Sequence, residues 1–148
     1  MHPKSVLAIA SGMFVAASAF AQQVTLPLPR LLTMMPMGGQ AGTSVEVAIT
    51  GENVEDVTEL QFSSPRITAK PVAGADRKFT VSIAADVPAG VYDARVMSRL
   101  GVSSARAFSV HTLREVTRTK ANNSVETAMP LPVGTICNAT MTRRAVDF

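Results

Sequence analysis

The chain has 148 residues, enough for one domain with a modest core, and its 14 basic and 11 acidic residues leave a formal net charge of +3. The basic residues are scattered and are accompanied by one tyrosine and no tryptophan, whereas nucleic-acid binding normally uses a clustered basic face with stacking aromatic rings. We therefore expect no nucleic-acid partner. The single cysteine excludes an internal disulfide, so the folded chain must be stabilised by packing.

The first residues, MHPKSVLAIASGMFVAASAFAQQ, have the three parts of a secretory signal peptide. Lys4 precedes an uncharged apolar run from Val6 to Ala21, and the run ends in a small-x-small triplet. The run is short for a membrane span, which needs roughly 20 apolar residues. We predict a signal peptide over 1–21, cleaved after Ala21, and export to the periplasm, the cell surface or the medium, with no membrane span after cleavage. An uncleaved anchor helix is the alternative.

The next stretch is predicted to be extended rather than helical, because prolines interrupt it at 27, 29 and 36. It breaks at the glycine pair Gly38 and Gly39. From Val45 onward the pattern changes to a strict alternation of apolar and polar residues, which is typical of strands.

This alternation recurs in six short segments, each with the period of a strand that buries one face. The predicted strands span 45–50, 57–64, 66–72, 78–85, 90–98 and 104–113. The side chains expected to meet in a common core are Val45, Val47, Ile49, Leu60, Phe62, Ile67, Ala69, Phe79, Val81, Ile83, Tyr92, Ala94, Val96, Phe108 and Val110. Turn-forming residues separate the segments. The pattern predicts an all-β fold, an immunoglobulin-like antiparallel β-sandwich over 22–112.

The segment DVPAGVYDARV, residues 86–96, combines two carboxylates, a tyrosine and an arginine. Its first half is predicted to be a corner between strands, in which Asp86 binds the corner's own amides. Tyr92 then suits a tyrosine corner, whose hydroxyl bonds to backbone a few residues upstream. Asp93 and Arg95 alternate with apolar residues and should point away from the core. A metal or acid–base pair of Asp86 and Asp93 is the alternative, and it lacks further oxygen donors.

Catalytic patterns are missing from the sequence. It contains no Gly-x-Ser-x-Gly elbow, no His-Glu-x-x-His motif and no phosphate-binding loop. A catalytic thiol at Cys137 would need a histidine partner, and His111 is the only histidine beyond the signal peptide. We interpret Cys137 as a half-buried strand cysteine. The sequence predicts no catalytic residues, no cofactor-binding residues and no metal ligands, and hence a chain that is not an enzyme.

The run GGQAGTSVEVAITGENV and the later GVSSARAFSV resemble the IPT/TIG group of immunoglobulin-like domains. The likeness covers residues 24–112, with the opening motif at 42–53 and the closing strand at 101–110. This resemblance implies an immunoglobulin-like fold and an exported, multidomain bacterial protein. It implies little about a ligand.

The tail resembles a linker followed by the start of a bacterial pre-peptidase C-terminal domain. The resemblance places the linker at 113–130 and the truncated start of a second β-domain at 131–148. Relatives of that kind can bind calcium, for which Glu126 and Asp147 would be the candidates, but Ala145 stands where the motif has a second acidic residue. The residues that match the opening of the motif are Asn122, Asn123, Glu126, Thr127, Ala128, Leu131 and Pro132.

These observations predict a non-catalytic exported module that serves as a spacer or binding domain of a cell-surface or secreted bacterial protein. Its partner would be a protein or glycan at the cell surface, contacted through the loops at 51–57 and 73–77, and the module itself would be a monomer. Because the chain stops at AVDF, inside an apolar strand-like run, we expect a fragment of a longer protein.

Two alternatives remain open at this point. The chain could be the N-terminal accessory region of a secreted peptidase or other hydrolase whose catalytic domain lies elsewhere. It could also be a periplasmic subunit that pairs with a partner by strand addition at an exposed sheet edge.

Overall fold

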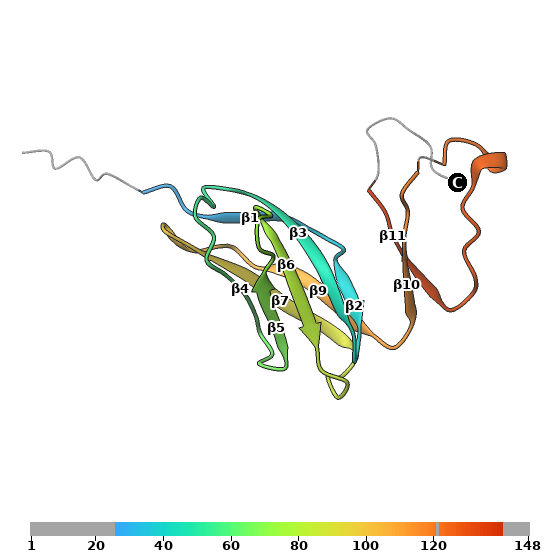
Figure 1. Ribbon diagram of the computed structural model, residues 1–148, viewed down its shortest axis with the longest axis horizontal. Helices are drawn as coiled ribbons and strands as arrows, with labels where there is room; N and C mark the ends of the chain where they lie inside the picture. The colour runs from blue at the N-terminus through green and yellow to red at the C-terminus, as the bar shows by residue number, and fades with distance from the viewer. Residues whose placement is uncertain (1–25, 121, 141–148) are drawn as a thin grey trace, which may run out of the picture.

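A computed structural model describes residues 26–120 and 122–140, and the predicted signal peptide lies outside these ranges. The described chain is almost entirely β, in two packed sheets and one small additional sheet (Figure 1). The first sheet has four antiparallel strands, in the spatial order β1 (Arg30–Met35), β3 (Ser44–Glu52), β6 (Lys78–Ile83) and β5 (Ile67–Pro71).

The second sheet has five strands. Its path is β2 (Gly38–Gln40), β9 (Arg106–His111), β7 (Gly90–Ser98) and β4 (Glu59–Phe62), with β8 (Gly101–Val102) paired to β7. All pairs are antiparallel except β2 with β9, which run parallel. This division of strands between two sheets is that of an immunoglobulin-type sandwich, so the predicted fold class is confirmed.

The core lies between the two sheets and contains the side chains that the alternation placed there, together with Leu31, Met34, Val54 and Val87. Of the fifteen side chains predicted to face inward, eleven are buried in this core. The other four pack against it and stay partly exposed: Val45, Phe62, Ala69 and Tyr92. Phe108 is fully buried, and its ring meets Phe62 edge to face with centroids 5.0 Å apart. Because the described residues form no α-helix that could cover them, the apolar faces of the two sheets are buried against each other, and the period-two pattern leads to the sandwich.

Two strands that the alternation did not predict, β1 and β2, close one side of the sandwich. Leu31 and Met34 of β1 are buried in the core, but a bulge between Leu31 and Thr33 breaks the period-two pattern. The chain then crosses from the first sheet to the second at Met35–Pro36, whose peptide bond is cis, and the Ser109 amide donates to the Met37 carbonyl (2.9 Å). The proline-punctuated stretch is therefore extended, as predicted, and also part of the sandwich.

After β9 the chain turns into a small parallel sheet of two strands. Strand β10 (Arg114–Thr117) pairs with β11 (Thr135–Asn138), and a 3₁₀ turn, η1 (Val125–Thr127), lies between them. Figure 1 shows this unit beyond the end of the sandwich at which β9 finishes. The predicted linker, 113–130, thus begins with a strand, while the domain boundaries themselves stay a prediction.

A search of the described residues for a helix long and apolar enough to cross a bilayer finds none.

Candidate functional site

The corner at 86–90 is structural. The Tyr92 hydroxyl donates to the Pro88 carbonyl four residues upstream (2.8 Å), which confirms the predicted tyrosine corner. The prediction for Asp86 was wrong: its carboxylate accepts a hydrogen bond from the Arg66 guanidinium, and the corner itself is closed by the Val87 amide donating to the Ala84 carbonyl (3.2 Å).

Asp93 and Arg95 lie on the solvent face of β7, as predicted. They pair with each other (3.5 Å), and the Arg95 guanidinium also donates to the Ser103 carbonyl (3.4 Å). Asp86 and Asp93 therefore have separate cationic partners and do not form a pair. Across 26–120 and 122–140, no three residues of the types His, Cys, Asp and Glu gather in a metal-binding group.

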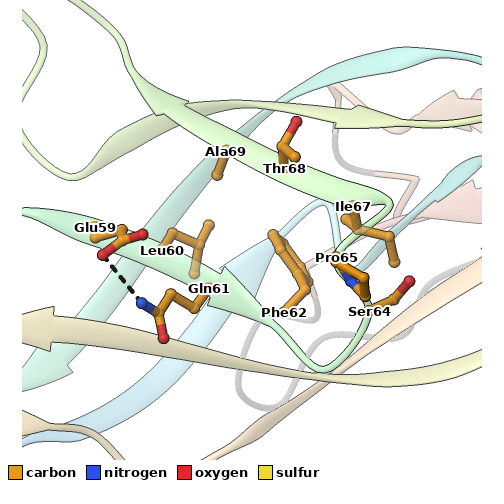
Figure 2. A pocket seen from close by; sticks show the side chains of 9 residues that line it. All are labelled: Glu59, Leu60, Gln61, Phe62, Ser64, Pro65, Ile67, Thr68 and Ala69. Carbon is orange, nitrogen blue, oxygen red and sulfur yellow. Dashed lines mark hydrogen bonds between the residues drawn. The ribbon is translucent and has the colours of Figure 1, made fainter.

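The side of the sandwich opposite β1 and β2 is open, because β4 and β5 are the outermost strands of their sheets. A groove of about 380 Å³ lies there, lined by residues 59–62 of β4, by Ser64 and Pro65, and by residues 67–69 of β5. Figure 2 shows the side chains of Leu60 and Phe62 reaching from β4 toward β5. The groove therefore has an apolar floor and a polar rim.

The rim of this groove is held by local contacts. The Gln61 amide donates to the Glu59 carboxylate (3.0 Å), drawn as a dashed line in Figure 2. On the other side of β4, a smaller hollow of about 130 Å³ is bordered by residues 61–63 with Asp93 and Arg95. Sequence patterns could not indicate either hollow. The larger one depends on how the consecutive strands β4 and β5 are spaced in different sheets, and the smaller one joins residues 61–63 to Asp93 and Arg95, about 30 positions later.

The edges at this groove carry features that discourage strand addition. Strand β4 has only four residues, and β5 ends in Lys70 and Pro71. Short edge strands, lysine and proline are the usual means by which proteins keep an exposed edge from pairing with another chain.

The loops predicted to contact a partner are held by internal bonds. In 51–57, Val54 is buried, the Asn53 amide group donates to the Leu28 carbonyl (3.1 Å), and Asp56 pairs with Arg99 (3.6 Å). In 73–77, Asp76 pairs with Arg77 (3.6 Å). Both loops are exposed at several positions, so they stay accessible to a partner.

A third hollow lies where the sandwich meets the β10–β11 unit. It has a volume of about 290 Å³ and is bordered by Pro36, Gly39, Gln40, Thr43, Ser44, Val45, Arg114, Glu115 and Thr117. Beside it, His111 Nε2 lies 2.6 Å from Glu115 Oε1, and the side chains of the two residues are only 11% and 16% exposed. His111 was expected at most as a partner for a thiol, and its pairing with Glu115 was not predicted.

Cys137 lies in β11 and is partly buried, which confirms the interpretation of a half-buried strand cysteine. Of the two calcium candidates, Glu126 is fully exposed in η1, and Asp147 lies outside the described residues. A hydrogen bond to its own backbone, together with one from Ser124, holds the pKa of Glu126 below its usual value. The local turn accounts for that shift.

Aromatic side chains in the described chain are buried or half-buried. They are Phe62, Phe79, Tyr92 and Phe108. An exposed aromatic surface on which a sugar ring could stack is therefore absent from 26–120 and 122–140.

No family model matches the chain, and no curated protein matches it. Among solved structures, the chain is similar to SGBP-B of the Bacteroides ovatus mixed-linkage glucan utilization locus, determined in complex with a mixed-linkage heptasaccharide. The TM-score is 0.40 and the identity 20%, over 61% of this chain and 24% of that one. The two proteins share too little for the ligand of one to indicate the ligand of the other.

Proposed function

We propose that this chain is a non-catalytic, exported β-sandwich module that acts as a spacer in a cell-surface or secreted protein. The observation that carries the proposal is the direction of two strands: β2, which directly follows the first strand β1, and β9, the last strand of the sandwich. Strand β2 runs parallel to β9, with Gly38 opposite Ser109 and Gln40 opposite His111. The chain therefore enters the sandwich at one end and leaves at the other, as Figure 1 shows. A module with this path extends the chain by its own length.

The charged side chains of the sandwich support a passive role. Five arginine–carboxylate pairs on its surface hold most of its acidic groups, among them Arg30 with Glu52 (3.0 Å). Exposed pairs of this kind contribute little to stability, and they leave few unpaired charges to attract a charged partner. The outer face of the first sheet is lined with hydroxyl groups that bond to one another across strands, as Ser44 does with Ser82 (2.9 Å).

The spacer proposal is tested by duplicating the sandwich. In a chain in which residues 26–111 occur twice in tandem, small-angle X-ray scattering should show a monomer whose maximum dimension grows by the full length of one sandwich. The original chain is the matched control. A duplicated chain that is no longer than the original would contradict the proposal, because the two sandwiches would then fold side by side.

A binding role predicts a different result in a second assay. The full-length chain is immobilised and titrated with soluble polysaccharides and with surface protein extracts of its host. A spacer should show no saturable binding. Saturable binding that Gln61→Ala in the β4–β5 groove abolishes, and that Lys78→Ala on the opposite sheet leaves intact, would replace the spacer by a binding domain.

A further inference from the structure

The bend between β9 and β10 is held by side chains rather than by the backbone alone. The Gln40 side-chain amide donates to the Thr112 carbonyl (3.0 Å). The His111 ring spans the same bend: Nδ1 lies 3.0 Å from the Leu113 carbonyl oxygen, and Nε2 lies 2.6 Å from Glu115 Oε1. One imidazole therefore connects the last strand of the sandwich to the first strand of the β10–β11 unit.

Both partners of this imidazole are hydrogen-bond acceptors. A backbone carbonyl can only accept, and an ionised carboxylate can only accept. A neutral imidazole has a single N–H and can serve one of the two. The two contacts are satisfied together only when the His111–Glu115 pair holds one additional proton, as an imidazolium facing a carboxylate or as a carboxylic acid donating to a neutral ring. The first is a charge-assisted bond, which is consistent with the short 2.6 Å distance.

Few other charged groups lie close enough to influence the proton shared by His111 and Glu115. The His111 and Glu115 side chains are 11% and 16% exposed, so salt and water screen their interaction little. Of the residues that border the adjacent hollow, Arg114 is the other charged one, and the remainder are neutral. Strand β11, which pairs with β10, places the neutral residue Ile136 opposite Glu115.

We propose that His111 and Glu115 form a proton-dependent lock that sets the orientation of the β10–β11 unit on the sandwich. With the additional proton, both bonds across the bend are made and the bend is fixed. When the pH rises and the proton is lost, one bond is lost, and a bare ring nitrogen then faces an oxygen acceptor. The junction therefore loosens as the pH rises through the titration of the pair.

The lock goes beyond the spacer proposal and does not depend on it, because a binding domain with this junction would respond to pH in the same way. The chain has two histidines, and the other is His2 in the predicted signal peptide. Substitution of His111 and of Glu115 therefore distinguishes a response of this pair from a response of any other group in the chain.

The test measures the junction directly by electron spin resonance. Nitroxide labels are placed at Glu55→Cys on the sandwich and at Val133→Cys, both exposed positions, in the full-length chain with Cys137→Ser. The distance distribution between the labels should be narrow at pH 5.5 and broad at pH 8. The ratio of the locked to the unlocked population should fall about tenfold, which is typical of one lost hydrogen bond to a charged group.

Two variants and a control decide the outcome. His111→Gln should give a broad distribution that does not change with pH. Glu115→Gln should also give a distribution that does not change with pH, and it should be narrow, because the glutamine amide can donate to the bare ring nitrogen of a neutral imidazole and accept from an imidazolium. Glu46→Gln, the same chemical change on the exposed face of β3, should keep the response of the parent chain. A parent distribution that is unchanged between pH 5.5 and 8 would overturn the lock, and so would a Glu115→Gln chain that responds as the parent does. Neither result would bear on the length of the tandem chain.

Discussion

At the scale of single residues, Tyr92 shows that a local sequence pattern can predict a specific side-chain hydrogen bond. Its position at the start of a strand, directly after a Pro-Ala-Gly corner, predicted a hydroxyl bonded to nearby backbone, and the bond to the Pro88 carbonyl confirms it. Asp86 shows that local patterns cannot predict a side-chain contact with a residue that is distant in the sequence. Its partner Arg66 is 20 positions away in the sequence, and only the folded chain brings the two residues together.

Replacing Tyr92 by phenylalanine should therefore lower the free energy of unfolding by about 1 kcal/mol, the usual net value of one hydrogen bond. The loss stays modest because Pro88 is exposed, so water can bind the carbonyl that is released. Urea denaturation followed by circular dichroism measures the change. Val91→Thr, at the neighbouring exposed position, is the control and should stay within about 0.5 kcal/mol of the parent. Equal midpoints for Tyr92→Phe and the parent would show that the corner bond does not stabilise the fold.

At the scale of elements, the strands with an uninterrupted period of two were predicted, and β1, β2, β8 and β10 were not. The bulge in β1 shifts its side chains by one position, so that Leu31 and Met34 both reach the core although they are three residues apart. Strands β2 and β8 are too short to show any period. They are strands because long neighbouring strands offer them backbone partners.

The pairing of β2 with β9 requires a glycine at position 38, because there is no room for a side chain there. A Cβ at this position would lie 2.4 Å from the Ser109 carbonyl oxygen, which is backbone and cannot easily move. Gly38→Ala should therefore separate β2 from β9 and destabilise the fold by about 1–3 kcal/mol.

Gly90→Ala is the matched control for this substitution, because no atom lies within 4 Å of where the alanine Cβ would be. Its effect should be neutral or stabilising by up to about 1 kcal/mol. Thermal unfolding of the two variants beside the parent chain gives the comparison. If the two substitutions have equal effects, the close approach of β2 to β9 is not what holds β2 in place.

At the scale of the whole molecule, the parallel pairing of β2 with β9 decides how the module would bear tension. Force applied at residues 26 and 120 acts along these strands in opposite directions. The bonds between β2 and β9 are then loaded together, including those from Ser109 to Met37 and from Ala41 to His111 (both 2.9 Å). A pair loaded in this way resists until several bonds break at once.

Single-molecule pulling from residues 26 and 120 should therefore require a higher unfolding force than pulling from residues 28 and 55. Residues 28 and 55 lie at the same end of the antiparallel pair β1 and β3, where Arg30 is opposite Glu52. Force applied there pulls the two strands apart from that end, so their hydrogen bonds break one after another. The same chain at the same loading rate serves both measurements. Equal forces in the two geometries would mean that the pairing of β2 with β9 does not resist tension.

The amino-acid sequence by itself determined the strand-rich class, the sandwich and most of its core, because alternation along a strand records which face is buried. The predicted signal peptide and export are likewise sequence inferences, and they stay predictions. Tertiary structure alone decided the groove between β4 and β5, the opposite ends at which the chain enters and leaves, and the contact of His111 with Glu115 across the bend. These features depend on distances between backbone segments and on where a turn directs the chain, and a pattern of hydrophobicity contains neither.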